Sequence, residues 1–254
     1  MFTEDDITVV ICHWMTTRIT LGAIHNLRKF YPNIKILVVD DGSIEDDRSL
    51  FSASYHYQAA NDYYDNDPIR LENGIKEYNF EILHLDEHFG HGGAMDYGFR
   101  HVKTPLVLTM DNDIRLLKGG TIEAYLKDIN EDPDHIFAVG TTWWEHELSI
   151  KWIGLWFSLF QVKPIVKNNL SFKDIVIPVG VTLGQNLGTT IFINLGCAVY
   201  NMLTFKYPHH KGNYKAVFYP HPEHQPDIMR HIKKPEKVGA DQKIIDQWNE
   251  MVDG

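Results

Sequence analysis

The chain is poor in cysteine and in positive charge. Its two cysteines, Cys12 and Cys197, are far apart and lack the spacing of a zinc site, so we expect two buried free thiols rather than a disulfide. There are 24 lysine and arginine residues against 34 aspartate and glutamate residues, which gives a formal net charge of -10. Because a nucleic-acid-binding surface must be basic, this balance argues against nucleic acid as the main partner.

Long hydrophobic runs are also missing. No apolar run reaches the roughly 20 residues that a membrane-spanning helix needs. The nearest is Trp152 to Phe160, for which we expect an apolar core helix; contact with a lipid-linked acceptor at a membrane surface is the alternative. The first six residues include three acidic ones, Glu4, Asp5 and Asp6, unlike a signal or transit peptide. These features predict a soluble, cytoplasmic protein with at most peripheral membrane contact.

Two common nucleotide-binding motifs are absent. The chain has no Gly-Lys-Ser/Thr, and the loop after its first predicted strand has no Gly-x-Gly-x-x-Gly, which argues against a P-loop and a dinucleotide-binding Rossmann site. A nucleotide is not excluded, because a metal ion can supply positive charge locally.

With 254 residues, of which 44% are hydrophobic, the chain is long enough for an α/β domain with a sizeable core. We expect strands at 7–12, 34–39, 80–85, 106–110, 136–140 and 216–219, and helices at 19–30, 94–101 and 116–130. Strands that alternate with helices predict a mostly parallel sheet flanked by helices. The alternation stops near residue 140, so we expect one domain over 1–254 with a nucleotide-binding half, 1–140, and a second half, 141–254.

Acidic residues follow two of the predicted strands. Asp40 and Asp41 end the second strand, and Asp111 and Asp113 follow the run from Leu106 to Met110. Ligands of open α/β sheets bind at the carboxyl ends of the strands, and buried carboxylates need a partner or a cation. The pattern predicts a Mg2+ or Mn2+ site. A turn cap is the alternative at both places.

Four elements now stand in one order along the chain. They are the strand to Cys12, the strand to Asp40-Asp41-Gly42-Ser43, the segment His88-x-Gly90-x-x-x-Ala94-x-Asp96-x-Gly98, and the strand to Asp111-x-Asp113. Together they resemble the GT-A fold of nucleotide-sugar glycosyltransferases, most closely family 2, over roughly the first 115 residues. The chain departs from that family at His88 and Asp96, where the family usually has Asn.

The resemblance implies a donor site in the first half of the chain. It assigns Asp41 to the N–H of a uracil ring and Asp40 to the ribose. Trp14 would stack on the base, with core packing as the alternative. The residues expected to complete the donor contacts are Gly92, Gly93, Asp96, Asp111 and Asn112.

The resemblance also implies a metal ion bound to the donor diphosphate. Asp111 and Asp113 would hold Mn2+ or Mg2+. A histidine from a C-terminal loop would be a third ligand, and His221 is our first choice, ahead of His224 and His209. For each histidine the alternative is a solvated side chain.

The second half would bind the acceptor and supply a general base. The Glu-Asp motif in which family 2 usually places this base is missing in its common form, so the stereochemistry stays open. We expect Glu145 or Glu147 to be the base, ahead of Asp174 and Asp227. The alternative is that both glutamates are exposed acids beside core tryptophans.

The function implied is a metal-dependent transfer of a sugar from a nucleotide donor, UDP-linked in our prediction, to a hydroxyl group of a carbohydrate, lipid-linked or protein acceptor. A sugar-nucleotide pyrophosphorylase is disfavoured, because its glycine-rich loop after the first strand is absent here. A non-catalytic nucleotide- or carbohydrate-binding module on the same fold is the third alternative.

Overall fold

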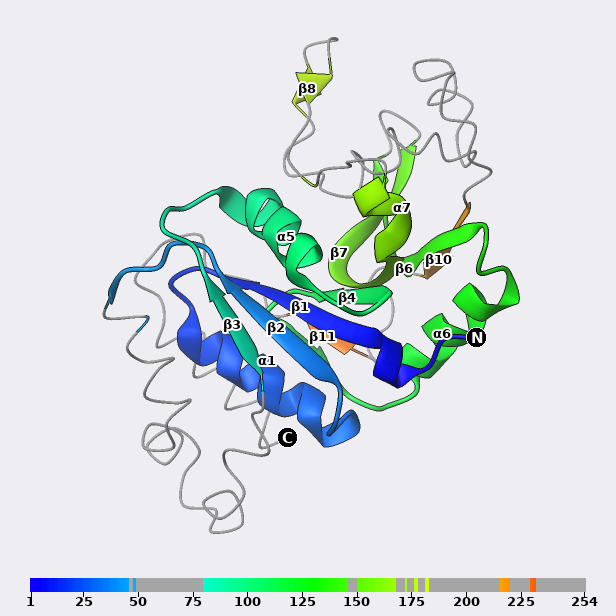
Figure 1. The fold of residues 1–254 in the computed structure, drawn as a ribbon, viewed down its shortest axis with the longest axis horizontal. Coiled ribbons are helices and arrows are strands. Elements are labelled where there is room, and N and C mark those ends of the chain that lie inside the picture. The colour runs from blue at the N-terminus through cyan, green and yellow to red at the C-terminus, as the bar shows by residue number, and fades with distance from the viewer. Residues whose placement is uncertain are drawn as a thin grey trace.

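The computed structural model describes residues 1–45, 48, 80–145, 150–167, 172, 176–177, 181–182, 215–219 and 229–231 (Figure 1). The helices of this part are η1 (Glu4–Asp6), α1 (Thr17–Phe30), α5 (Gly90–His101), α6 (Thr121–Glu131) and α7 (Val162–Lys167). The strands of the main sheet are β1 (Ile7–His13), β2 (Lys35–Asp40), β3 (Glu81–His84), β4 (Leu106–Met110), β6 (Ile136–Glu145), β7 (Ile150–Gln161) and β10 (Lys215–Tyr219). Two small pairs lie outside it, namely β5 (Ile114–Leu116) with β11 (Met229–His231) and β8 (Val176–Ile177) with β9 (Val181–Thr182).

The main sheet is mixed but mostly parallel, with the strand order β10-β6-β7-β4-β1-β2-β3. β1 pairs in parallel with β2 and β4, β2 with β3, and β10 with β6. β7 runs antiparallel to both β4 and β6. Consequently β1, β2, β4 and β6 all end at the same edge of the sheet. The α/β class and the mostly parallel sheet predicted from the sequence are confirmed.

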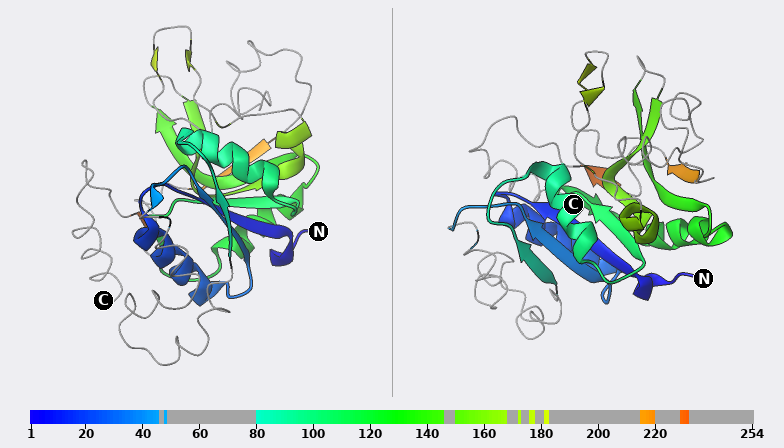
Figure 2. Two further views of the ribbon diagram at one scale, coloured as in Figure 1. Left: turned by 60° about the vertical axis from the view of Figure 1, so that its left-hand side comes forward. Right: turned by 45° about the horizontal axis from the view of Figure 1, so that its top comes forward.

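Helices cover both faces of the sheet, with α1 and α5 on opposite sides of the strands (Figures 1 and 2). One core cluster combines residues of α1 and α6 with Val9, Ile11, Ile36 and Val38. The other combines residues of α5 and α7 with Val10, Leu37 and Val39. Alternate residues of β1 and β2 therefore face opposite helices, as the period of two in a strand requires. This alternation determines where the polar residues after each strand lie.

The segment from Trp152 to Phe160 forms most of β7, so the helix predicted there is wrong. Phe157 and Leu159 pack into the α1-side cluster, whereas Ile153 and Phe160 pack into the α5-side cluster. A strand covered on both faces is apolar at every position, and this pattern does not distinguish it from a buried helix.

The helix predicted from residue 116 begins five residues later, at Thr121. Residues 114–116 form β5 instead, and Gly120 has a φ of +98°, a left-handed conformation that interrupts the chain before α6. The helix predicted from residue 94 starts earlier, at Gly90, and β6 continues five residues past Gly140. The predicted strand at 216–219 is confirmed as β10.

Cys12 is a half-buried thiol, and Cys197 lies outside the described residues. Within the described part of the chain, no helix has both the length and the apolar character needed to cross a membrane. The division into a donor half and an acceptor half stays a prediction.

Candidate active site

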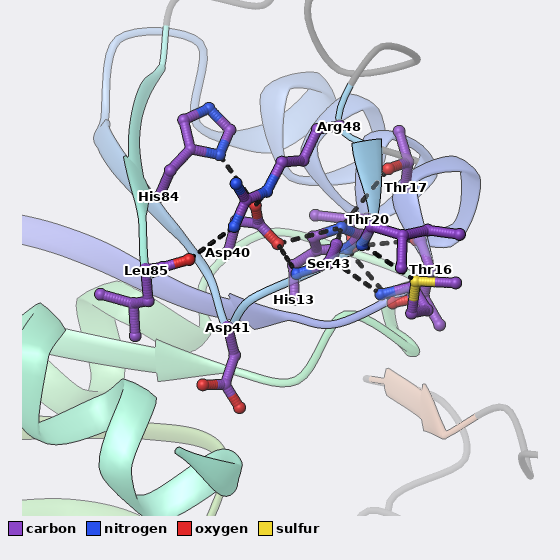
Figure 3. Close-up of polar contacts among 12 residues, drawn as sticks. His13, Thr16, Thr17, Thr20, Asp40, Asp41, Ser43, Arg48, His84 and Leu85 are labelled. Atoms are coloured by element: carbon purple, nitrogen blue, oxygen red, sulfur yellow. Dashed lines mark hydrogen bonds and ion pairs between the residues drawn. The ribbon is translucent and has the colours of Figure 1, made fainter. Parts of the chain in front are cut away.

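Asp40 and Asp41 lie on opposite sides of the sheet. Along β2, Ile36 and Val38 face α1 while Leu37 and Val39 face α5. The same alternation places Asp40 on the α1 side and Asp41 on the α5 side. Figure 3 shows the Asp41 side chain pointing away from the group of residues that contact Asp40.

Asp40 is fully buried, and both its carboxylate oxygens accept hydrogen bonds. Its Oδ2 accepts from Arg48 Nε at 3.0 Å and lies 2.8 Å from His84 Nδ1, while Oδ1 accepts from Ser43 N at 3.1 Å (Figure 3). Burial alone would raise the pKa of Asp40, but the hydrogen bonds from Ser43 and His84 outweigh it and lower that pKa. Asp40, expected near the ribose, faces α1 instead, with its charge compensated inside the protein.

Asn112 belongs to the same side. Its Nδ2 donates to Thr16 Oγ1 at 2.7 Å and to Thr20 Oγ1 at 3.1 Å, and its side chain is buried. Thr20 Oγ1 also lies 3.1 Å from His13 Nδ1. We call this group the α1-side network: His13, Thr16, Thr20, Asp40, Ser43, Arg48, His84 and Asn112. It joins the ends of β1, β2 and β4, and Asn112 lies within it on the side of α1, while the donor contact expected of Asn112 stays a prediction.

Asp41 is held at the N-terminus of α5. Its Oδ1 accepts from Phe89 N at 2.7 Å, and its Oδ2 lies 2.7 Å from His88 Nδ1. Burial raises the pKa of Asp41, although the hydrogen bonds from Phe89 and His88 oppose the shift. Asp41 therefore serves α5 as a capping acceptor supplied by another element.

Gly42 explains how the segment before α5 comes so close to Asp41. It has a φ of +73°, and a Cβ added to it would lie 2.5 Å from the carbonyl carbon of Glu87 and 2.6 Å from His88 N. A side chain at residue 42 would push this backbone away, so the glycine is required for the contact between His88 and Asp41.

Trp14 lies in the loop after β1 and stacks on His88. The ring centroids are 4.3 Å apart, and the ring planes are inclined by 21°. Trp14 is 45% exposed, so the alternative of core packing does not apply. A hydrogen bond joins the loop after β1 to the turn after β2, because Met15 N donates to Ser43 Oγ at 2.9 Å.

Asp111 lies at the end of β4, and its backbone N–H donates to Trp156 O at 2.8 Å. Its Oδ1 is 3.5 Å from His91 Nε2, and its side chain is partly exposed. The segment from His88 to His91 thus contacts both Asp41 and Asp111. We call this group the α5-side site: Trp14, Asp41, His88, His91 and Asp111.

Asp113 follows in a tight turn and is buried, with 2% of its surface exposed. In the described part of the chain, no three His, Cys, Asp or Glu side chains gather as a metal site. Asp111 and Asp113 are two positions apart in the sequence, and two carboxylates can suffice for Mg2+ or Mn2+, because these ions complete their coordination with water and substrate phosphate. Asp111 and Asp113 are therefore compatible with the predicted metal, whereas His221 lies outside the described residues.

Gly92, Gly93 and Asp96 are all buried within α5 rather than in an open loop. Asp96 Oδ1 accepts from Phe172 N at 2.7 Å, which joins α5 to Phe172. The two glycines lie in the first turn of this helix, and the donor contacts expected of them stay a prediction. His91 was not among the predicted site residues; its position within the glycine cluster was the available signal.

Glu145 is the last residue of β6, where its backbone pairs with Ile150 of β7. β6 ends at the same edge of the sheet as β1, β2 and β4, so the backbone of Glu145 lies at that edge. Its side chain is not described. The other predicted acceptor-side and third-ligand residues lie outside the described residues: Glu147, Asp174, His209, His224 and Asp227.

The sequence profile of glycosyl transferase family 2 matches residues 8–183, which is more than half of the chain. The chain belongs to glycosyl transferase family 2. No curated protein matches its sequence.

Solved structures of glycosyltransferases are similar to this family 2 chain in fold. The mannosyltransferase PcManGT from Pyrobaculum calidifontis, in complex with GDP-Man and Mn2+, has a TM-score of 0.56 at 14% identity over 91% of this chain and 58% of that one. TarS from S. aureus has a TM-score of 0.53 at 11% identity, over 94% of this chain and 38% of that one. TarS 1–349 in complex with UDP-GlcNAc has a TM-score of 0.54 at 10% identity, over 91% and 59%. The shared fold is GT-A, and the chain spans less than two thirds of each of these structures.

Proposed function

We propose that this chain is a glycosyltransferase that moves a sugar from a nucleotide-diphosphate donor, a UDP-sugar in our prediction, to a hydroxyl acceptor. The observation that carries the proposal is that one segment, His88 to His91, contacts both Asp41 and Asp111. These acids lie at the carboxyl ends of parallel strands, where α/β sheets bind ligands. Two similar structures carry GDP-Man with Mn2+ and UDP-GlcNAc, which supports a nucleotide-sugar donor.

In this proposal the donor base lies beside Trp14, whose exposed indole provides an aromatic surface for stacking. The diphosphate lies near Asp111, at the N-terminus of α5, where backbone N–H groups favour an anion. The α1-side network does not touch the donor; it fixes the loops that carry Trp14, Asp41 and Asp111.

Mn2+ or Mg2+ would be held by Asp111 and Asp113, with His221 as the proposed third ligand. When bound, the ion would stabilise the negative charge that builds on the leaving nucleoside diphosphate. His91, 3.5 Å from Asp111, would keep that carboxylate in place before the ion binds.

The acceptor is a carbohydrate, a lipid-linked sugar or a protein hydroxyl group. Glu145 or Glu147 would take the proton from this hydroxyl group as the bond to the sugar forms. β6 brings Glu145 to the same edge as the donor site, which is the support for this assignment.

Calorimetric titration of UDP with and without Mn2+ tests the proposal. We expect the wild type to bind UDP in a Mn2+-dependent manner, and Asp111→Ala and Asp113→Ala each to lose that dependence while keeping their circular dichroism spectrum. Asp134→Ala, which removes an exposed acid away from the site, is the matched control. Binding that is equal with and without Mn2+, or unchanged in both site variants, would refute the metal-dependent donor site. With a UDP-sugar and acceptor, release of UDP rather than pyrophosphate distinguishes a transferase from a pyrophosphorylase.

A further inference from the structure

The exposed side chain of His88 contacts the buried carboxylate of Asp41. The Asp41 side chain is 3% exposed, whereas the His88 side chain is 47% exposed. Asp41 Oδ1 is already occupied by the backbone N–H of Phe89. A ligand that approaches this end of β2 therefore meets the imidazole of His88 before it meets the carboxylate.

The surroundings of His88 determine which of its ring nitrogens carries hydrogen. Nδ1 lies 2.7 Å from Asp41 Oδ2 and 3.2 Å from the backbone carbonyl oxygen of Asp41. A backbone carbonyl oxygen only accepts hydrogen bonds, so Nδ1 must be the donor. In the neutral ring the other nitrogen, Nε2, then keeps its lone pair and is an acceptor. The Asp41 carboxylate is therefore occupied by His88 Nδ1, and the exposed acceptor of the pair is His88 Nε2.

We propose that His88 Nε2 recognises the base of the donor by accepting a hydrogen bond from a ring N–H group, with Asp41 as the residue that positions the imidazole. This inference rests on the proposed function, and it names the class of base. Trp14 supports it geometrically, because its ring is within 21° of parallel to the imidazole. A base that pairs in the plane of the imidazole presents its face nearly parallel to the indole.

The chemistry of the bases then sets the specificity. Uracil carries a hydrogen on N3 and guanine carries one on N1, so each offers a donor to His88 Nε2. The corresponding ring nitrogens of cytosine and adenine are acceptors, and two facing acceptors form no bond. A polar group that loses its partner on binding costs free energy, so the site should select UDP or GDP over CDP and ADP.

A competing arrangement is that His88 swings away and Asp41 accepts the ring N–H directly. The two arrangements differ in what removal of the imidazole does. Direct contact predicts that His88→Ala keeps or improves base selection, because the cover over Asp41 is gone. Recognition by His88 predicts that the same variant loses it.

The test is calorimetric titration with UDP, CDP and N3-methyl-UDP in the presence of Mn2+. For the wild type we expect UDP to bind at least about tenfold more tightly than the other two, which corresponds to one hydrogen bond. For His88→Ala we expect the three affinities to agree within about twofold, because the imidazole nitrogen that distinguishes them is gone.

His84→Ala is the matched control. His84 Nδ1 lies 2.8 Å from the neighbouring carboxylate of Asp40, and its side chain is 42% exposed, so it resembles His88 in its carboxylate partner and its exposure but lies on the other side of the sheet. We expect His84→Ala to select among the three ligands as the wild type does.

Wild-type selection retained in His88→Ala would overturn the inference and leave the proposed function intact. Loss of selection in both histidine variants would also overturn it, since the effect would then reflect general loosening of the site. A wild type that binds no nucleoside diphosphate would overturn the proposed function, and the inference with it.

Discussion

The acidic residues on the two sides of the sheet edge differ in the partners that contact them. On the α1 side, Asp40 is fully buried and its charge is met by Arg48, His84 and Ser43. On the α5 side, the carboxylate of Asp41 contacts the half-exposed His88, which stacks on the exposed Trp14. Asp40 has its charge compensated inside the protein, whereas Asp41 lies against an exposed histidine, although the two residues are adjacent in the sequence.

The same division recurs at the end of β4. Asn112 donates to two threonines at the start of α1, whereas Asp111 lies within 3.5 Å of His91 on α5. The pleat of each strand therefore places consecutive residues on opposite sides, with Asp40 and Asn112 in the α1-side network and Asp41 and Asp111 in the α5-side site. Substitution of a residue on one side should therefore leave the contacts on the other side unchanged.

The largest effect on stability should come from Asp40→Ala. It removes the shared acceptor of Arg48, His84 and Ser43, and we expect a loss of about 3 kcal/mol, since one hydrogen bond to a charged group contributes about 1.5–3 kcal/mol. Urea denaturation measures the change in the free energy of unfolding. A loss below about 1 kcal/mol, typical of exposed pairs, would show that the network is not structural.

Asn112→Ala should have the next largest effect. It removes two buried hydrogen bonds to Thr16 and Thr20, and we expect a loss of about 2 kcal/mol in the free energy of unfolding. The affinity for UDP should fall much less than in Asp111→Ala, measured by the same titration. Equal losses of affinity in the two variants would contradict the division between the sides.

Asp41→Asn should show the reverse pattern. We expect the affinity for UDP to fall about tenfold, because an amide nitrogen facing His88 Nδ1 cannot accept its hydrogen and the imidazole loses its orientation. Unfolding at neutral pH should need no less urea than in the wild type, since the variant removes a charge that burial disfavours. A variant that unfolds readily and binds UDP normally would invert the roles assigned here.

The smallest effect is a pair of opposite pH dependences. The pKa of Asp40 is lowered in the folded state, so its contribution is complete above its ordinary value of 3.8 and is lost as the pH falls through the folded pKa. The pKa of Asp41 is raised, so its contribution is present below 3.8 and is lost as the pH rises through the folded pKa. The stability of the wild type relative to Asp40→Asn should therefore shrink on acidification, and relative to Asp41→Asn it should grow. Denaturation curves between pH 3 and pH 6 measure both, and slopes of the same sign would contradict the assignment.

The parallel strands and the acids at their ends could be predicted from the sequence, because apolar runs that stop at carboxylates mark the edge of such a sheet. The separation of Asp40 from Asp41 was equally available from the period of two along β2, yet the family resemblance assigned both to the donor. The contact between His88 and Asp41 could not be predicted, since it joins residues 47 positions apart through a loop that Gly42 shapes. The strand at Trp152 to Phe160 was missed because burial on both faces removes the alternation that identifies a strand.

A crystal structure of the chain with UDP and Mn2+ tests the central claim most directly. The account predicts the nucleotide on the α5 side, with its base against Trp14 and His88 and its diphosphate next to Asp111. The α1-side network should keep its hydrogen bonds unchanged. A nucleotide in contact with Asp40 or Asn112, or bound away from the α5-side site, would contradict the account.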